Sequence, residues 1–358
     1  MTTRLVITGV GGFGRTHLEN ARRLEAEGRV EIVATVDPAV PEAYGSLGEA
    51  LAKHPADIVI VATPPHTHFA LAEQSLRAGA DVLLEKPPLP SLGEFERLLA
   101  LEQQTGHVVQ VGFQSLGSHA IEVLQHDVAA VSATGLWSRT NSYWTRSRWA
   151  GKRTLDGRPV VDGVATNALA HAVATALRIA GYDRPGFDAA AMTVEVDAYR
   201  VNDIETDDTT SLRVTGPGMP TVTCALSLCA PPELVERTDH AAVVQVTSPQ
   251  ASAQFSYTTD VVTRGDTHER FGRTDLLENL LDHRDSGAEL IVPLHSTAAF
   301  QHVLEALRVA PPPAAIPARH VTWHGEAGDR HPIIADIERL AHDAAVSGRL
   351  FRELPAFT

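Results

Sequence analysis

Apolar residues in the first third of the chain fall into short, nearly continuous runs with amphipathic stretches between them. The runs are rich in Val and Ile and cover residues 4–10, 30–37, 56–62, 80–84 and 107–113. Helical spacing of apolar positions marks the stretches 14–28, 66–79 and 91–106. Buried strands that alternate with amphipathic helices are typical of a parallel sheet covered on both faces. The pattern therefore predicts a doubly wound α/β domain over residues 1–120.

After residue 120 the pattern changes to β-like stretches separated by polar or proline-bearing turns. These stretches cover residues 135–147, 190–201, 209–216, 220–230, 241–248 and 252–259. Helical spacing interrupts the series at 164–180, 274–284, 296–309 and 333–348. Such a series predicts a large, mainly antiparallel sheet. We therefore expect residues 121–358 to form a mixed α+β domain, with a last helix that is free to pack back on the N-terminal domain.

Composition narrows the possible partners. A chain of 358 residues exceeds one typical hydrophobic core, which agrees with two domains. The formal net charge of -14 argues against nucleic acid and anionic membranes as partners, because both attract basic surfaces. Cys224 and Cys229 are too few for a disulfide framework, and the sequence has no zinc spacing. Without a signal peptide or an apolar run near 18 residues, we expect a cytoplasmic protein.

A glycine-rich turn separates the first predicted strand from the first predicted helix. Its glycines stand in G-x-G-x-x-G order, and an aspartate ends the second strand. This arrangement provides a tight turn, close backbone approach to a pyrophosphate and a carboxylate for an adenosine ribose. The carboxylate would repel a 2′-phosphate, so we expect NAD in preference to NADP. The cofactor candidates in this turn are Gly9, Gly11, Gly12, Phe13, Gly14 and Asp37.

A lysine ends the fourth predicted strand, in "LLEKPPLP" at residues 83–90. Ligands of open parallel sheets lie beyond the carboxyl ends of the strands, so Lys86 is placed to meet one. An ammonium there could donate a hydrogen bond to a substrate oxygen and stabilise negative charge that develops on it. The alternative is a Glu85–Lys86 surface pair that merely ends the strand.

The motifs "GVGGFGRTH", "ATPPHTH", "EKP" and "VGF" occur in this order and resemble the Gfo/Idh/MocA oxidoreductase family over the whole N-terminal domain. The resemblance implies a Rossmann domain in which the lysine of E-K-P sits beside the nicotinamide and contacts the reacting substrate oxygen. The following proline, often in a cis peptide, holds that turn. Carried over, Lys86 is a catalytic candidate, and the cofactor-side candidates are Thr63, Pro64, His68, Glu85, Lys86 and Pro87.

The second element of the family is a helix with a histidine that faces the nicotinamide. The matching stretch, "DGVATNALAHAVATAL" at 162–177, supplies His171 and, four residues earlier, Asn167. This spacing places both on one face of a regular helix. Asn167 replaces a frequent aspartate and Ala174 replaces a frequent acid; an amide can orient an imidazole but cannot balance its charge. We expect catalytic roles for His171 and Asn167 and a helix-capping role for Asp162.

Aromatic and arginine residues are interleaved at 137–153. Trp faces can stack on sugars and Arg can reach hydroxyls or a carboxylate, so Arg146, Arg148 and Trp149 are candidate substrate contacts. Packing beneath the sheet or at a subunit contact is the alternative. The acids Glu205, Asp207 and Asp208 are interpreted as a solvated turn before a strand, and no metal is expected at either these acids or the histidines 66–68.

The resemblance implies an NAD(P)-dependent oxidoreductase that acts on a hydroxyl or carbonyl carbon of a sugar, sugar derivative, polyol or inositol. One alternative is an NAD-dependent enzyme that cleaves glycosides through transient oxidation and elimination. Another is a protein that senses NAD or a sugar without catalysis. Because the C-terminal sheet of the family commonly packs against that of another subunit, we expect substrate binding and oligomerisation in residues 121–358, as a homodimer or homotetramer.

Overall fold

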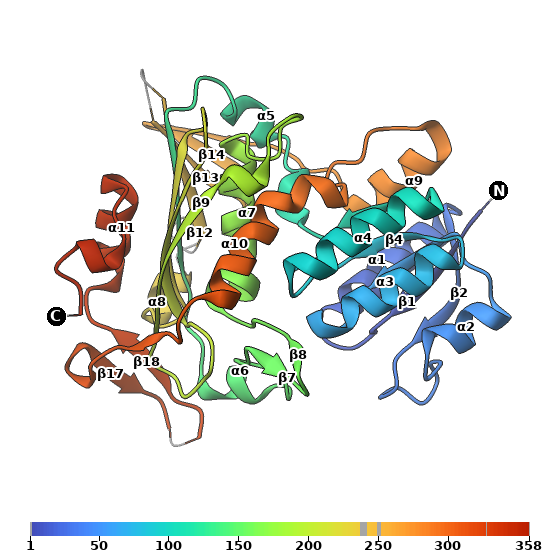
Figure 1. Ribbon diagram of the computed structural model, residues 1–358, viewed down its shortest axis with the longest axis horizontal. Helices are drawn as coiled ribbons and strands as arrows, with labels where there is room; N and C mark the ends of the chain where they lie inside the picture. Colours follow the sequence, from blue (N-terminus) through green and yellow to red (C-terminus); the bar gives the residue numbers. More distant parts are fainter. Residues whose placement is uncertain (1, 237–241, 249–251, 327, 358) are drawn as a thin grey trace. The chain divides into compact units, whose positions relative to one another are not determined.

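The computed structural model describes residues 2–236, 242–248, 252–326 and 328–357 (Figure 1). The chain forms two compact units, one from Met1–Phe113 with Asp275–Thr297 and the other from Gln114–Thr274 with Ala298–Thr358. The sequence placed the division near residue 120 and assigned everything after it to one domain. The unit boundaries differ mainly in the segment 275–297, which returns to the N-terminal unit.

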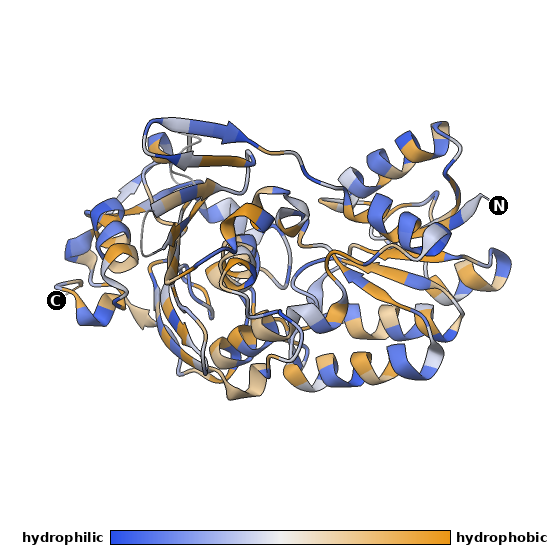
Figure 2. Cartoon of the chain, turned by 90° about the horizontal axis from the view of Figure 1, so that it is seen from above, coloured by the Kyte–Doolittle hydropathy of each residue, from blue (hydrophilic) through white to orange (hydrophobic). Residues whose placement is uncertain are grey.

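The first unit contains a five-stranded parallel sheet in the order β2-β1-β3-β4-β5. Its strands are apolar and its helices carry both hydrophobic and hydrophilic residues (Figure 2). The doubly wound prediction is confirmed. The strands are β1 Thr3–Thr8, β2 Val30–Val36, β3 Ile58–Val61, β4 Asp81–Leu84 and β5 Val109–Val111, and the helices are α1 Gly14–Ala26, α2 Leu47–Lys53, α3 His68–Arg77, α4 Leu92–Thr105 and α9 Leu276–Ser286.

Helix α9 reaches this unit across a long stretch of chain, and Figure 1 shows it beside the blue and cyan helices. The fully buried Gln110 of β5 holds it there. The Gln110 side-chain amide donates to Leu276 O at 2.7 Å and to Asn279 Oδ1 at 2.9 Å. Its oxygen accepts from Val292 N at 3.0 Å. This one side chain therefore satisfies three polar groups of the returning segment.

The second unit is built on a nine-stranded sheet in the order β15-β14-β13-β12-β6-β11-β10-β9-β16. Neighbouring strands are antiparallel except for the pairs β6–β11 and β9–β16. The expected large, mainly antiparallel sheet is confirmed. Its strands are β6 Ala130–Leu136, β9 Thr193–Arg200, β10 Thr209–Thr215, β11 Thr221–Ser227, β12 Ala242–Thr247, β13 Ser252–Ser256, β14 Val261–Arg264, β15 Thr267–Arg270 and β16 Ala314–Ala315.

Helices cover both faces of this sheet. Helix α7, Ala170–Ile179, packs on β6, β11 and β12, and α10, Ala298–Val309, packs on β9 and α7. Helix α11, Ile337–Ser347, packs on β6 and β11 from the opposite face (Figure 1). The last helix thus lies on the sheet of its own unit. The remaining elements are α5 Ala120–Leu124, α6 Asn141–Thr145, α8 Pro232–Glu236 and the hairpins β7 Thr154–Leu155 with β8 Arg158–Pro159 and β17 Val321–His324 with β18 His331–Ile334.

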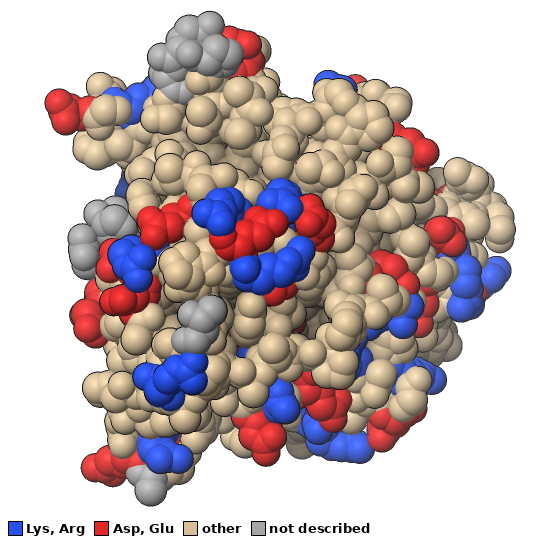
Figure 3. Space-filling model, turned by 60° about the vertical axis from the view of Figure 1, so that its left-hand side comes forward, with Lys and Arg blue, Asp and Glu red and all other residues tan. Residues whose placement is uncertain are grey.

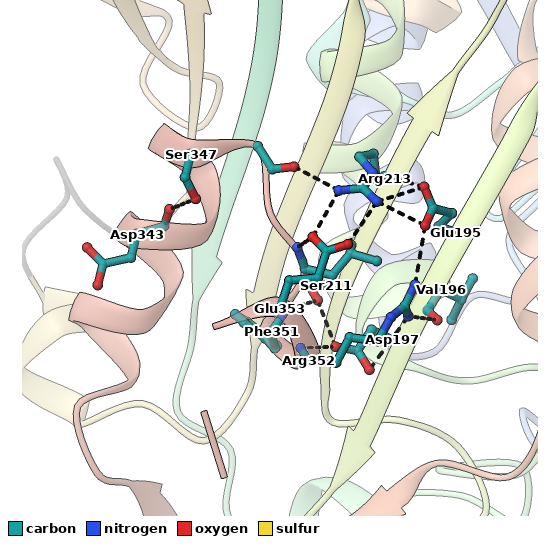
Figure 4. Close-up of polar contacts among 12 residues, drawn as sticks. Glu195, Val196, Asp197, Ser211, Arg213, Asp343, Ser347, Phe351, Arg352 and Glu353 are labelled. Carbon is teal, nitrogen blue, oxygen red and sulfur yellow. Dashed lines mark hydrogen bonds and ion pairs between the residues drawn. The ribbon is translucent and has the colours of Figure 1, made fainter. Parts of the chain in front are cut away.

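Ion pairs attach the C-terminal residues to the edge of the sheet beyond α11 (Figure 4). Arg213 of β10 pairs with Glu195 of β9 at 2.9 Å and with Glu353 at 2.9 Å. Phe351 is fully buried beneath them, and its backbone N–H donates to Ser211 Oγ at 2.8 Å. On the face drawn in Figure 3, basic and acidic side chains are intermingled in the same way. Arg352 also pairs with Glu195, at 3.3 Å, so two arginines and a buried ring hold the end of the described chain.

Candidate active site

The glycine turn between β1 and α1 has the geometry of a phosphate-binding loop. Gly9 has φ of +78°, and a Cβ there would lie 2.4 Å from Ala62 O; a Cβ at Gly14 would lie 1.7 Å from Gly9 O. Both positions therefore require glycine. Gly12, by contrast, has no heavy atom within 4 Å of an added Cβ, so the loop is open on that side. Helix α1 has no acidic residue in its first turn, which leaves its positive end suited to an anion.

Asp37 follows β2 and braces this loop. Its Oδ2 accepts from Val10 N at 3.1 Å and from Gly11 N at 3.3 Å, and its Oδ1 accepts from Ala39 N at 3.0 Å. The carboxylate therefore lies beside the glycine turn, as the Rossmann fingerprint requires. These residues fit a dinucleotide whose pyrophosphate meets the loop.

Glu85 of the E-K-P turn is a buried residue with a partner that the sequence did not indicate. It is 7% exposed, and its Oε1 lies 2.8 Å from His17 Nε2 of α1, which is 6% exposed. Its Oε2 accepts from Lys86 N at 3.1 Å. A Cβ at Gly112 would lie 2.7 Å from Oε1, so this glycine leaves room for the carboxylate. The alternative of a Glu–Lys surface pair is wrong for Glu85.

His68 begins α3 and connects the ends of two strands. Its ring is fully buried, with Nδ1 3.0 Å from both Pro87 O and Pro88 O and Nε2 2.8 Å from Thr63 O. Burial lowers the pKa of the imidazole. The Lys86–Pro87 peptide is cis, as the resemblance implies, and Lys86 itself is half-buried. We infer that His68 positions Thr63 and Pro87 at the cofactor side of the sheet and does not itself meet a ligand.

In the second unit, the expected continuous helix over 164–180 is wrong at its start. Residues Val164–Ala168 form a π-helical turn, Leu169 has φ of -113°, and the regular helix α7 begins at Ala170. Single π turns in helices are uncommon and occur frequently at functional sites. Because of this turn, Asn167 and His171 do not share the face of one regular helix.

His171 is half-buried and contacts a serine that the sequence analysis missed. Its Nδ1 lies 3.1 Å from Ser115 Oγ, and Thr175 Oγ1 donates to the same Ser115 Oγ at 3.0 Å. Its ring centroid lies 6.2 Å from that of Tyr257, and burial raises the pKa of the Tyr257 phenol. Ser115 follows the Rossmann strands in a short 3-10 turn, Gln114–Gly117, and no sequence pattern marked it.

Asp162 does not cap the helix, contrary to the expectation. It is 2% exposed, and its carboxylate accepts from Asn167 Nδ2 at 2.5 Å, from Gly151 N at 2.8 Å and from Arg146 Nη2 at 2.9 Å. Instead, Asp207 approaches the start of the π turn, because the Ala165 amide is one of its hydrogen-bond donors. The acid that approaches the π turn is thus Asp207, while Asp162 is held by three donors of its own.

The interpretation of Asp207 and Asp208 as a solvated turn is also wrong. They are 4% and 0% exposed, and burial raises the pKa of each carboxyl. Thr210 Oγ1 donates to Asp207 at 2.6 Å, and Asn202 donates to Asp208 through its backbone and its side chain, each at 2.8 Å. Buried acids of this kind need such donors. Within the described ranges, no set of three or more His, Cys, Asp or Glu side chains could hold a metal ion.

The arginine candidates for substrate contact have different environments. The Arg146 guanidinium lies 3.9 Å from the ring centroid of Tyr143 and 4.7 Å from that of Trp149, and it pairs with Asp162. Arg148 is exposed and pairs with Asp156 at 3.3 Å. Arg146 and Trp149 are therefore linked to Asn167 through Asp162, whereas Arg148 is separate from this group.

The predicted site residues thus form two groups, one in each unit. The first unit brings the glycine turn, Asp37, Thr63, His68, Glu85 and Pro87 to the carboxyl ends of its strands, with Lys86 on the same turn. The second unit contains Asn167, His171, Arg146 and Trp149.

Comparisons with known proteins support a cofactor-binding role for the site residues of the first unit. Residues 3–113 match the profile of the Gfo/Idh/MocA group, described as "Oxidoreductase family, NAD-binding Rossmann fold". Over 121 residues the chain is 32% identical to 4-carboxy-2-hydroxymuconate-6-semialdehyde dehydrogenase from Sphingobium sp., which covers 30% of this chain and 38% of that protein. Over 125 residues it is 33% identical to inositol 2-dehydrogenase 1 from Saccharopolyspora erythraea, covering 32% and 37%. The chain therefore matches well under half the length of these curated relatives.

Solved structures extend the likeness of the fold to both units. The WlbA dehydrogenase from Chromobacterium violaceum, solved with NADH and UDP-GlcNAcA, has a TM-score of 0.71 at 17% identity, covering 86% of this chain and 92% of that one. GenD2 from gentamicin A biosynthesis, solved with NAD, has a TM-score of 0.66 at 20% identity, covering 85% and 93%. The glycine turn, the E-K-P turn and the family match agree, and residues 3–113 of this chain therefore match the NAD-binding Rossmann domain of the Gfo/Idh/MocA oxidoreductases.

Proposed function

We propose that this chain is an NAD-dependent dehydrogenase that acts on a CH–OH group of a sugar derivative, polyol or inositol. The observation that carries the proposal is the E-K-P turn at the carboxyl end of β4, where buried Glu85 accepts from the Lys86 backbone N–H and buried His68 contacts the carbonyl groups of Pro87 and Pro88. Two buried titratable side chains that hold the backbone of this turn are more than the end of a strand needs.

The glycine turn and Asp37 would hold the dinucleotide, and the turn around Thr63 and Pro87 would border its nicotinamide end. When bound, NAD supplies the acceptor for the hydride that leaves the substrate carbon. We propose a preference for NAD over NADP, because the Asp37 carboxylate would repel a ribose 2′-phosphate. The donors to that carboxylate are the backbone N–H groups of Val10, Gly11 and Ala39.

The protein side chains divide the remaining work. Lys86 donates a hydrogen bond to the reacting oxygen and stabilises negative charge on it. His171 takes the hydroxyl proton at Nε2, which requires its Nδ1 to carry the other proton and donate to Ser115 Oγ, 3.1 Å away. Ser115 can accept this hydrogen bond and that of Thr175 together, because a hydroxyl oxygen has two lone pairs.

The proposed substrate class follows the names of the relatives, which include inositol 2-dehydrogenases and a galactose 1-dehydrogenase. The aromatic faces beside Arg146 suit the apolar face of a sugar ring. A cytoplasmic location and a homo-oligomer belong to the same proposal. Within the described ranges, none of the helices has the length and apolar character that a bilayer crossing demands.

The test follows absorbance at 340 nm with NAD or NADP and a panel of sugars, sugar acids, polyols and inositols. We expect NADH to appear with a member of the panel and turnover to fall by ~10²–10⁴-fold in His171→Ala and in Lys86→Ala, with NAD binding retained. No NADH with any substrate would overturn the proposal. Cofactor that copurifies without NADH release would favour glycoside cleavage through transient oxidation, and binding without turnover would favour a sensor.

A further inference from the structure

Asp162 is a buried acid that no simple role in the fold explains. Three donors converge on its carboxylate: the Arg146 guanidinium, the Gly151 backbone N–H and the Asn167 carboxamide. The first two come from residues preceding it, and the third comes from the π turn that leads into the His171 helix. Asp162 therefore connects the aromatic–arginine segment to the backbone beside the candidate base.

The carboxylate determines which way the Asn167 amide faces. A carboxylate oxygen accepts hydrogen bonds, so the group 2.5 Å away must be the NH₂ of Asn167 and not its carbonyl oxygen. The planar amide then directs Oδ1 away from Asp162. With Asp162 in place, Asn167 offers an acceptor on its other side, and a rotation of the amide by 180° would set two oxygens against each other.

The backbone that carries Asp162 is held in an unusual conformation. Val161 has φ of +54° and is 2% exposed, and a β-branched residue rarely adopts this region. Hydrogen bonds maintain it: Asp162 N donates to Lys152 O at 3.0 Å, and Gly163 N donates to Val161 O at 3.0 Å. Backbone strain of this kind persists only where the surrounding structure holds it, and it is frequent at functional sites. Here it directs the carboxylate inward.

The Arg146 side chain, which donates to Asp162, is itself held in place by its neighbours. Its guanidinium lies between the rings of Tyr143 and Trp149, and its Nη1 donates to Tyr143 O at 2.6 Å. Only 27% of its side chain is exposed. The planar cation is thus held against Asp162 by stacking as well as by charge, which leaves little freedom to the carboxylate.

We propose that Asp162 is a positioning residue, which fixes the Asn167 carboxamide with Oδ1 as the acceptor beside the His171 helix. The inference rests on the proposed dehydrogenase function and adds to it. An asparagine locked in this way can accept a hydrogen bond from a substrate hydroxyl or from an imidazole N–H, as a carboxylate would. The negative charge lies on Asp162, one hydrogen bond away from the amide. The Asn167 departure from the family pattern is then compensated by an acid elsewhere in the chain.

A double-mutant cycle tests whether Asp162 acts through Asn167. We expect Asp162→Asn to lower kcat by about 10- to 100-fold, because a small misplacement of a catalytic group has an effect of this size, and to leave the KM for NAD unchanged. In the Asn167→Ala background, Asp162→Asn should lower kcat by less than about twofold, since the group that it positions is absent. Asp203→Asn, a fully exposed aspartate of the same unit, is the matched control and should leave kcat unchanged.

The same loss of kcat in both backgrounds would mean that Asp162 serves only the fold, and it would overturn the proposal. A second readout does not depend on turnover. In protein labelled with ¹⁵N-asparagine, the Asn167 side-chain amide, assigned by its absence in Asn167→Asp, should exchange slowly and lose this protection in Asp162→Asn. If no substrate is turned over, the proposed dehydrogenase function fails alone. If protection is equal in both proteins, the positioning role fails whatever the activity.

Discussion

At the scale of single residues, polar side chains that are buried in pairs shape both groups of candidate site residues. Glu85 with His17 and His68 with three carbonyl groups hold the turn that carries Lys86, and Ser115 with Thr175 supports His171. Each of these groups would be costly to bury without its partner. Their presence therefore indicates that the backbone of the Lys86 turn and the ring of His171 are held in place before any ligand arrives.

Replacement of Ser115 tests this for the imidazole. In Ser115→Ala, Nδ1 of His171 loses the hydroxyl 3.1 Å away, and the proton of the neutral ring can occupy either nitrogen. We expect kcat to fall by about tenfold with an unchanged KM for NAD. The exposed Ser142→Ala is the control. An unchanged kcat in Ser115→Ala would show that the tautomer is set without Ser115.

The buried carboxyl of Glu102 should make the free energy of unfolding depend on pH. Burial raises the pKa of this carboxyl from its ordinary value of 4.5 to about 7. Because the folded state holds the proton more tightly than the unfolded state, stability falls as the pH rises from about 4.5 to 7 and the loss is complete above it. Glu102→Gln should therefore raise the free energy of unfolding by about 1–3 kcal/mol at pH 8 and change it little at pH 4.5.

Urea unfolding at the two pH values measures this difference. Glu96 lies exposed on the same helix, and Glu96→Gln is expected to show no such pH dependence. A gain in stability that is equal at pH 4.5 and pH 8 would contradict the assignment of the effect to the ionisation of Glu102.

At the scale of elements, the strands and the motifs of the first unit are predictable because their signals are local. Alternating buried runs and glycine spacing suffice for the sheet, for Gly9 and Gly14, and for the lysine at the end of β4. Asp162, Asp207 and Ser115 were not predictable, because their partners lie far away in sequence or on a π turn that breaks the helical period. From sequence alone, an aspartate that precedes an apolar helix is predicted to cap it. The sequence does not reveal that a distant acid, here Asp207, approaches the start of the helix instead.

At this scale we predict that Gln110 is needed to hold helix α9 on the first unit. Gln110→Leu keeps the size of the side chain but leaves Leu276 O, Asn279 Oδ1 and Val292 N without their buried partner. We expect a loss of roughly 2–4 kcal/mol in the free energy of unfolding, from desolvated groups at about 1–3 kcal/mol each. Hydrogen exchange should quicken in 275–297. Gln103→Leu on the exposed side of α4 is the control, and equal exchange in both variants would refute the role of Gln110.

At the scale of the whole molecule, the stability of the first unit should depend on its cofactor. Any ligand that binds only the folded chain raises its melting temperature by mass action. We expect NAD to raise the melting temperature more than NADP at equal concentration, and Asp37→Ser to reduce that difference. The Asp37 carboxylate also holds Val10 and Gly11, so the variant without ligand should melt lower. A larger shift with NADP in the original protein would overturn the proposed preference.

The return of residues 275–297 to the first unit has a consequence for the chain as it is made. Val111 N donates to Val292 O at 2.9 Å, so the returning segment covers the outer edge of β5. During synthesis this edge waits for roughly 180 further residues, on the order of 10–40 s at about 5–20 residues per second. For that time an apolar sheet presents unpaired backbone groups, which are a template for association with other chains. The nascent protein therefore has a period of vulnerability in which a chaperone on the ribosome would protect it. A truncated chain that ends at the Rossmann strands would never leave that period.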